Sequence, residues 1–399
     1  MVDPTKLQYA TEVPRPSPDH VIPTMEWDRA PWNRWSFLHI REALATVEVW
    51  RGQGAVRHLE RAERALDTLQ VKSVDGKNCS LSEFLTETYT DGLLMIHRGK
   101  IVFESYLNGM EPRTLHLSQS VAKSVVGMTA GILIERGLLD PRNLVSRYLP
   151  ELANTGWKGA TLQQTMDMTT GVRFDETYID PHSDMGQLDV AAGWKPIPRG
   201  TNGNLKWPAH VWEQILELNN QSRPHGEVFE YRSIETDVLA FCMERVTGKR
   251  LAQVVSEELW QKLGVEESAC FTVDRAGYAL ADGGFNATLR DYGRFGQMIL
   301  SGGQEIVPAT WIEETRNANH HVFGEPYTTV LPHGGYHNQF WVENQSSRNL
   351  MCRGVFGQLI YIDFTHDLVV VKLSTWPDFL NAKVMVATLA AIRTVAMSL

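Results

Sequence analysis

The chain is poor in cysteine, and its cysteines show none of the spacings that bind metal. Its 399 residues include only four, with no C-x-x-C pair: Cys79, Cys242, Cys270 and Cys352. Scattered cysteines of this kind indicate neither a zinc site nor a disulfide framework, so we expect reduced residues in the core. Nothing else in the sequence calls for a metal or a cofactor, and we expect neither.

Positive charge is also scarce. The 38 Lys and Arg residues face 47 Asp and Glu residues, which gives a net charge of −9. This charge disfavours nucleic-acid backbones and anionic membranes as partners and mildly favours cationic small molecules. No apolar run reaches membrane-spanning length, and the N-terminus lacks a basic region followed by an apolar one. We therefore expect a cytoplasmic protein with no nucleic-acid or membrane partner, and the sequence leaves a homodimer open.

Two common hydrolase motifs are missing. None of the 13 histidines lies in an H-E-x-x-H pattern, and there is no G-x-S-x-G nucleophile elbow. The histidine-containing segments 320–321 and 333–337 are expected in surface loops. Histidine is therefore a weak candidate for a catalytic base.

Strand patterns occur near both ends of the chain. Residues 92–106 predict a β-hairpin that turns at 98–100. Residues 357–363 and 368–374 predict a second antiparallel hairpin. The proline-rich residues 1–35 predict an extended arm, which tryptophans would hold against the surface: Trp27, Trp32 and Trp35.

Helical patterns fill most of the remaining chain. Residues 137–264 show several of them, separated by loops rich in Gly, Pro and Asp, and no strand-rich segment. Further helices are expected at residues 36–69, 290–300 and 380–399. Strands at both ends with helices between them predict an antiparallel α/β (α+β) fold with an inserted all-helical subdomain. The α/β domain would comprise 1–136 and 266–399, the subdomain 137–265, and the active site would lie between them.

One stretch carries an arrangement that can do chemistry. Residues 121–134 are apolar or small on almost every face, which predicts a buried helix, yet Lys123 lies in its first turn. Ser120 is three residues earlier, so the two side chains share a face. Burial disfavours a charged ammonium, and we expect a lowered pKa that makes Lys123 a base near neutral pH. Ser120 at the helix start would meet free N–H groups that favour a developing anion.

The same stretch has a plainer interpretation. Ser118 or Ser120 would only cap the helix, and Lys123 would extend to solvent. A motif with two fixed positions arises by chance about once in a chain of this length. It occurs once here, in the one helix that looks fully buried.

A serine–lysine pair needs a group that carries a proton to the leaving group, commonly a tyrosine in a Tyr-x-Asn or Tyr-x-Ser motif. Three tyrosines fit: Tyr106, Tyr231 and Tyr336. Tyr106 ends a predicted strand, and Tyr336 lies in a glycine-rich loop that could be a surface turn. Tyr231 precedes a predicted helix from 234 to 246 and is favoured, with Ser233 as its partner or as the helix N-cap.

A second oxyanion donor is expected in residues 353–357, where glycine permits a close backbone approach to a ligand. The plainer interpretation of that segment is a β-bulge.

Taken together, these motifs resemble the class C β-lactamase-like serine hydrolases, and within them most closely the 6-aminohexanoate-dimer hydrolases, which cut nylon oligomers. The resemblance covers most of the chain. It rests on Asn33-Arg34-Trp35, Ser120-Val-Ala-Lys123, residues 231–240, Gly283-Gly284, residues 288–291, residues 354–358 and residues 371–378.

The resemblance implies a β-lactamase/penicillin-binding-protein-like fold and specific roles. Ser120 would be the nucleophile, Lys123 its general base and Tyr231 the proton donor to the leaving amine. The backbone N–H groups of Ser120 and Val355 would form the oxyanion hole, and Ser233 would support the network.

It also implies a substrate site. Tyr178 would contact the substrate amide, and Asp189 would hold the ammonium end of the aminohexanoate dimer. Trp194 would line the pocket, together with Asp282 and Gly354. Without the resemblance, Asp189 is better explained as a solvated loop acid.

The chain departs from β-lactamases in one place. They carry Lys-Thr-Gly or His-Thr-Gly on the strand beside the nucleophile, whereas this chain has Cys352-Arg353-Gly354. Efficient β-lactam hydrolysis is therefore not expected. Three hypotheses remain: an amidohydrolase for small linear amides with a free amine, a carboxylesterase or acyltransferase with the same nucleophile, and a penicillin-binding sensor that acylates without turnover.

Overall fold

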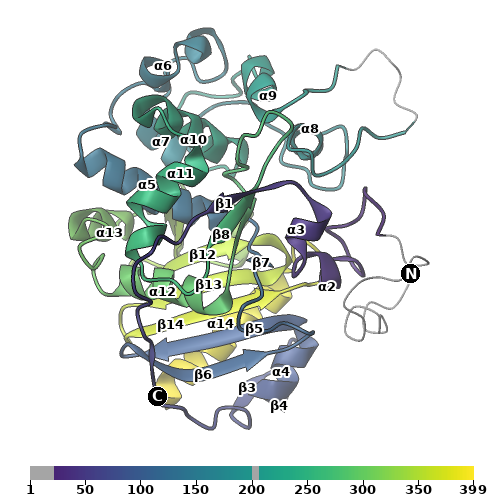
Figure 1. The fold of residues 1–399 in the computed structure, drawn as a ribbon, viewed down its shortest axis with the longest axis vertical. Helices are drawn as coiled ribbons and strands as arrows, with labels where there is room; N and C mark the ends of the chain where they lie inside the picture. Colours follow the sequence, from purple (N-terminus) through teal and green to yellow (C-terminus); the bar gives the residue numbers. More distant parts are fainter. Residues whose placement is uncertain (1–21, 200–205) are drawn as a thin grey trace.

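Strand-forming segments from the two ends of the chain meet in one eight-stranded sheet (Figure 1). The computed structural model describes residues 22–199 and 206–399. The strand order is β10-β11-β12-β13-β14-β5-β6-β2, antiparallel throughout except for the β2–β6 pair. The strands are β2 (Glu60–Arg61), β5 (Thr90–His97), β6 (Lys100–Tyr106), β10 (Gly335–His337), β11 (Phe340–Val342), β12 (Leu350–Gly354), β13 (Gln358–Asp363) and β14 (Leu368–Ser374). Both predicted hairpins are therefore present.

Alternation of side chains gives this sheet two buried faces. Leu94 and Ile96 of β5 belong to one core, which includes residues of the helices α5 and α12. Leu93 and Met95 belong to the other, which includes residues of α4 and α14. The helices are α4 (Leu81–Glu87), α5 (Val121–Glu135), α12 (Leu289–Leu300) and α14 (Ala382–Ser398). The predicted helices 290–300 and 380–399 correspond to α12 and α14.

The prediction of a helix over 36–69 is wrong. This segment holds only the short α3 (Ile40–Ala43), followed by extended chain with β1 (Thr46–Val49) and β2. β1 pairs with β8 (Ala269–Thr272), more than 200 residues away, so tertiary pairing overrides the local pattern. Together with β9 (Phe285–Ala287) and β7 (His116–Leu117) they form a second sheet, and β3 (Gln70–Lys72) pairs with β4 (Asn78–Ser80).

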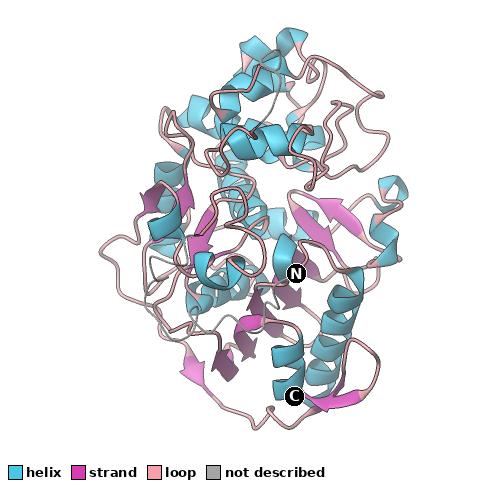
Figure 2. Cartoon of the chain, turned by 90° about the vertical axis from the view of Figure 1, so that its right-hand side faces the viewer, coloured by secondary structure: helices cyan, strands magenta, loops and turns pink. Residues whose placement is uncertain are grey.

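The middle of the chain is helical, as predicted. Figure 1 shows its helices at one end of the molecule, and Figure 2 shows the same end from the side with helices and loops alone. The elements are α6 (Val145–Tyr148), η2 (Pro150–Asn154), α7 (Leu162–Met166), α8 (Asp184–Ala191), α9 (Val211–Glu217), α10 (Ile234–Thr247), α11 (Leu251–Glu258) and η3 (Trp260–Lys262). The domain boundaries drawn from the sequence stay a prediction.

The N-terminal arm can be judged only in part, because residues 1–21 lie outside the described residues. From residue 22 onward it forms turns and the short helix α2 (Asn33–Ser36) rather than an extended chain. Trp27 holds it in place, since its Nε1 donates to the Trp194 carbonyl at 2.7 Å and its ring lies edge-on to that of Trp194. Trp35 stacks on His39.

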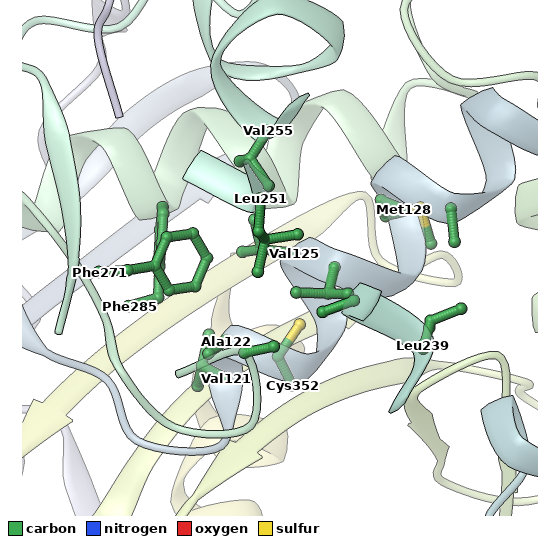
Figure 3. Packing of buried hydrophobic residues seen from close by; sticks show 14 of the residues in the cluster. Val121, Ala122, Val125, Met128, Leu239, Leu251, Val255, Phe271, Phe285 and Cys352 are labelled. Atoms are coloured by element: carbon green, nitrogen blue, oxygen red, sulfur yellow. The ribbon is translucent and has the colours of Figure 1, made fainter. Parts of the chain in front are cut away.

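Helix α5 lies at the centre of the molecule. Every residue from Val121 to Leu133 is buried. Figure 3 shows Val125 among side chains of α10, α11 and β8, including Leu239, Leu251 and Phe271. The remaining helical elements are α13 (Ala309–Thr315), η4 (His320–Val322), η5 (Tyr327–Thr329) and η6 (Val355–Gly357). In the described part of the chain, no helix has the length and apolar character to span a membrane.

Candidate active site

Ser120 occupies the N-cap position of α5, and Lys123 lies one turn further on. The Lys123 Nζ donates to the Ser120 Oγ at 3.0 Å, so the shared face expected from the spacing is present. Ser120 makes no side-chain cap hydrogen bond. Its hydroxyl therefore faces Lys123 at the positive end of the helix, where a developing anion is favoured.

Lys123 does not extend to solvent. It is 1% exposed, and its ammonium also donates to the Ser233 Oγ at 3.2 Å and to the Asp282 carbonyl oxygen at 2.6 Å. The Asp282 Oδ2 lies 3.7 Å from the same nitrogen. An ammonium with hydrogen-bond acceptors on several sides is fixed in direction as well as position.

The expected lowering of the Lys123 pKa is wrong. Burial is the largest influence and does lower this pKa, but Tyr231, Asp282 and Glu176 together raise it, and the net pKa lies above that of an ordinary lysine. A sequence window of four residues cannot reveal these groups, since all are distant in the chain. The acidic groups around Lys123 therefore favour its charged form, and a charged Lys123 must lose a proton before it can act as a base.

Tyr231 completes the group around the nucleophile. Its ring centroid is 5.1 Å from the Lys123 Nζ, and both Lys123 and Ser120 are close enough to act on the pKa of its hydroxyl. Burial raises the pKa of Tyr231, Lys123 and Ser120 lower it, and the net pKa is raised. The ring stacks on Trp341 with centroids 5.5 Å apart, and the Tyr231 amide donates to the Tyr327 hydroxyl. Neutral Tyr231 is thus a held proton donor beside Ser120.

The two other tyrosines have structural surroundings. Tyr106 donates to Glu104 within β6. Tyr336 is buried rather than in a surface turn, and its ring lies edge-on to that of Tyr231 at 6.1 Å. The histidines also differ in part from the expectation of a surface location, because His337 is only partly exposed and pairs with Asp167 at 2.8 Å.

Glu176 is a site residue that the sequence interpretation missed. The Ser233 hydroxyl donates to the Glu176 Oε1 at 2.5 Å, and the Ser233 amide donates to Oε2 at 2.9 Å. Tyr178 also donates to Oε1, at 2.8 Å. Burial raises the Glu176 pKa, and although Lys123 and these hydrogen bonds oppose the rise, the net pKa is raised. Ser233 is thus a bridge between Lys123 and Glu176 and not a capping side chain, as α10 has no side-chain cap.

The proposed oxyanion donors face one cavity. Ser120 and Val355 both line a narrow cavity of about 20 Å³, here called the inner cavity. Gly354 precedes Val355 at the end of β12, before the turn η6 that joins β12 to β13. A Cβ on Gly354 would lie 2.4 Å from the Ser118 carbonyl oxygen, so glycine is required where this strand meets the nucleophile turn.

The inner cavity leads to the residues expected to bind substrate. Tyr178, Asp189, Trp194 and Asp282 all line it. The Trp194 Nε1 donates to Thr272 at 3.0 Å, which fixes the indole as a wall. Gly354 is not among these lining residues, and its role in substrate binding stays a prediction.

Asp189 is neither solvated nor free. Its Oδ2 pairs with the Lys195 Nζ at 2.8 Å, and Lys195 pairs on its other side with the Asp28 Oδ2 at 3.1 Å. The three side chains are 9–12% exposed. Burial raises the Asp189 pKa to about 6, Lys195 opposes this rise and Asp28 adds to it. Lys195 was missed because nothing in its own sequence surroundings marks it as a partner of Asp189.

Asp282 and Asp237 add further buried acid beside Lys123. The Asp237 Oδ1 accepts from the Ala281 amide at 2.9 Å. Burial first, and the Asp282 charge second, raise the Asp237 pKa well above its ordinary value. Burial also raises the Asp282 pKa, while Lys123 opposes the rise. The Asp282 Oδ1 is buried without a hydrogen-bond partner in the described residues, which leaves it able to accept one from a ligand.

Arg353 stands where β-lactamases carry their Lys-Thr-Gly motif. Its guanidinium lies over the Trp341 ring at 4.6 Å, and no described carboxylate pairs with it. Burial lowers its pKa to about 10, with Tyr231 opposing. Within residues 22–199 and 206–399, no group of three or more His, Cys, Asp or Glu side chains is disposed to hold a metal.

The fold and this site define a serine hydrolase. A model of the family described as Beta-lactamase matches residues 85–392, so the chain belongs to that family. The predicted fold class and the predicted resemblance are both confirmed.

Individual proteins show in more detail what the chain is similar to. The chain is 36% identical over 363 residues to the 6-aminohexanoate-dimer hydrolase of Paenarthrobacter ureafaciens, covering 89% of both chains. A solved structure named "Putative 6-aminohexanoate-dimer hydrolase from Bacillus anthracis" is similar with a TM-score of 0.85 and 29% identity, covering 96% of this chain and 98% of the other. EstCE1, "a hydrolase with promiscuous acyltransferase activity", has a TM-score of 0.60 at 16% identity, covering 77% of this chain and 95% of that one, and shows the fold alone.

Proposed function

We propose that this protein hydrolyses small linear amides that carry a free amine on the acyl side, such as the 6-aminohexanoate dimer, through an acyl-enzyme on Ser120. The observation that carries the proposal is the hydrogen bond from the Lys123 Nζ to the Ser120 Oγ at the start of a buried helix, with the Tyr231 ring centroid 5.1 Å from the same nitrogen. The 36% identical hydrolase from Paenarthrobacter ureafaciens supports the reaction class.

Acylation begins when the Ser120 Oγ attacks the amide carbonyl. Lys123 takes the hydroxyl proton, and the N–H groups of Ser120 and Val355 stabilise the oxyanion. Tyr231 donates its proton to the leaving nitrogen as the C–N bond breaks, and Lys123 reprotonates Tyr231. Water then attacks the acyl-enzyme by the same proton transfers in reverse, which releases the acid and restores Ser120.

The raised pKa of Lys123 requires a proton acceptor before the first step. The chain from the Lys123 Nζ through the Ser233 Oγ to the Glu176 carboxylate provides a path, with links of 3.2 and 2.5 Å. The raised pKa of Glu176 makes this carboxylate a better proton acceptor than an ordinary glutamate. Moving one proton along this path leaves a neutral Lys123 and a neutral Glu176 without placing net charge in the site.

The acyl side of the site favours a cation. Asp189 and Asp282 line the inner cavity with Ser120, and a carboxylate at a partly desolvated wall prefers an ammonium. Tyr178 and Trp194 supply the apolar surface that a methylene chain requires.

The test is release of amine from the linear 6-aminohexanoate dimer by the wild type and by Ser120→Ala. Release by the wild type alone, with a transient acyl adduct on Ser120 captured by rapid acid quenching, is the expected result. Turnover by Ser120→Ala at the wild-type rate would remove the mechanism.

Three results would replace the amidase by another activity. Turnover of p-nitrophenyl esters without amide cleavage would indicate a carboxylesterase, and dependence on an added amine or alcohol an acyltransferase. A stoichiometric burst without turnover would indicate a penicillin-binding sensor.

A further inference from the structure

The helix α8 ends in a turn that brings a lysine onto its own aspartate. The amides of Trp194 and Lys195 both donate to the Asp189 carbonyl oxygen, at 2.9 and 3.0 Å. This turn folds the chain back, so the Lys195 ammonium reaches the Asp189 carboxylate at 2.8 Å. The ion pair is thus built into the local backbone.

A second acid holds the same lysine from outside the helix. Asp28, in the segment before α2, pairs with Lys195 at 3.1 Å. Asp28 is 8% exposed, and its Oδ1 is buried with no hydrogen-bond partner in the described residues. Two carboxylates therefore share one ammonium, and the trio carries a net negative charge when both acids are ionised.

The three residues are arranged around a wall between two cavities. Asp189 lines the inner cavity together with Ser120. Asp28, Lys195 and Asp189 all line a second cavity of about 230 Å³, here called the outer cavity, which Tyr178 and Trp194 also line. Lys195 lines the outer cavity and not the inner one, whereas Asp189 lines both.

We propose that the Lys195 ammonium competes with the substrate's ammonium group for the Asp189 carboxylate. This competition sets how strongly the site prefers cationic acyl chains. In the empty site Lys195 neutralises Asp189. When a substrate ammonium binds Asp189 from the inner cavity, Lys195 stays paired with the Asp28 carboxylate. The inference rests on the proposed function for the identity of the substrate, but it concerns binding and does not require turnover.

The alternative is that the trio only holds the arm against α8. The sign of two substitutions distinguishes the proposal from this alternative. Removing the Lys195 charge leaves two unpaired acids and should strengthen cation binding. Removing the Asp28 charge leaves Lys195 paired with Asp189 alone and should weaken cation binding. If the trio has a purely structural role, the two substitutions should not change cation binding in opposite directions.

The experiment measures equilibrium binding by calorimetry in a Ser120→Ala background, which prevents turnover. The probes are 6-aminohexanamide and heptanamide, which differ in a terminal ammonium against a methyl group. Lys195→Met should tighten 6-aminohexanamide roughly tenfold, and Asp28→Asn should weaken it by a similar factor, with heptanamide unchanged in both. The ratio of the two dissociation constants cancels general effects on the pocket.

Lys206→Met is the matched control, because Lys206 also lies between two acids, Glu213 and Glu217, but is 69% exposed on the surface. It should leave the ratio unchanged. The inference would be overturned if a variant changed the dissociation constants of both probes equally. It would also be overturned if Lys195→Met and Asp28→Asn shifted the 6-aminohexanamide constant in the same direction, or if 6-aminohexanamide did not bind. Failure of the proposed function is seen separately, as absence of amine release by the wild type.

Discussion

The Ser233 hydroxyl joins two charged groups, because it accepts from Lys123 at 3.2 Å and donates to Glu176 at 2.5 Å. A hydroxyl placed in this way can pass a proton by exchanging its own. The bridge gives Glu176 a function that its position in a polar loop would not suggest, and it makes the protonation of Lys123 depend on a residue 53 positions away.

Glu176→Gln should therefore change the pH profile as well as the rate. In the wild type one proton is shared by Lys123 and Glu176, so activity begins once pH exceeds the raised Glu176 pKa. In the variant Lys123 must lose its proton to solvent, so the acid limb of kcat should move to higher pH. We expect a loss of roughly 10²-fold at pH 7 with partial recovery near pH 10.

The control for this change is Glu227→Gln, an exposed acid in the loop before Tyr231. It should leave both the rate and the acid limb unchanged. A uniform loss at every pH in Glu176→Gln would show that Glu176 only supports the fold of the site.

Gly354→Ala should damage catalysis without unfolding the protein. The added Cβ would meet the Ser118 carbonyl oxygen at 2.4 Å, and Ser118 is held by hydrogen bonds from both its amide and its hydroxyl to Phe285. The turn before Ser120 must therefore shift, and we expect kcat to fall about 10²-fold, as for loss of oxyanion alignment.

Gly283→Ala tests the specificity of that effect. Gly283 lines the same inner cavity, but its Cβ would find only ordinary contacts, at 3.6 Å from Trp194. Its kcat should stay within about twofold of the wild type. Equal losses in the two variants would mean that any added methyl group in the cavity disturbs the reaction.

Local periodicity was enough to predict the hairpins, α5 and the Ser120–Lys123 pair, because each depends on residues close in sequence. The prediction of a helix over 36–69 was wrong because β1 is held in an extended conformation by its pairing with β8. The prediction of a lowered Lys123 pKa was wrong for the same reason. Burial alone lowers this pKa, and the groups that raise it come from distant parts of the chain. The Lys195–Asp189 pair could not be predicted, because the two residues are further apart than the three or four positions at which helical side chains meet, and the turn after α8 brings them together.

Arg353→Met should alter recognition of the leaving group. Arg353 stacks on Trp341, the ring on which Tyr231 also stacks, and pairs with no carboxylate in the described residues. A leaving amine that ends in a carboxylate gives this cation a partner. We expect KM for the 6-aminohexanoate dimer to rise roughly tenfold, while KM for its C-terminal amide stays unchanged.

Arg250→Met provides the comparison, since Arg250 also lies over a ring, that of Tyr278, but is half exposed and pairs with Glu244. Neither KM should change. If Arg353→Met raised both KM values equally, the guanidinium would serve packing on Trp341 and not the substrate carboxylate.

Glu235→Gln should change how stability depends on pH. Glu235 is fully buried on α10, accepts from the Trp157 Nε1 at 2.8 Å and is bonded to Thr170. Burial raises its pKa from 4.5 to about 7, with Arg232 opposing. The folded protein therefore holds this proton more tightly than the unfolded chain does. The stability it contributes is fully present below pH 4.5 and is lost as pH rises to about 7.

The wild type should accordingly lose about 3 kcal/mol from this group across that window, as a shift of this size implies. Glutamine keeps the acceptor for Trp157 and never ionises, so urea unfolding of Glu235→Gln at pH 5, 6, 7 and 8 should show a flatter dependence. The exposed Glu111→Gln should follow the wild type. Parallel pH curves for the wild type and Glu235→Gln would mean that Arg232 keeps Glu235 ionised at low pH, and the buried side chain would then be one half of an ion pair and not a protonated acid.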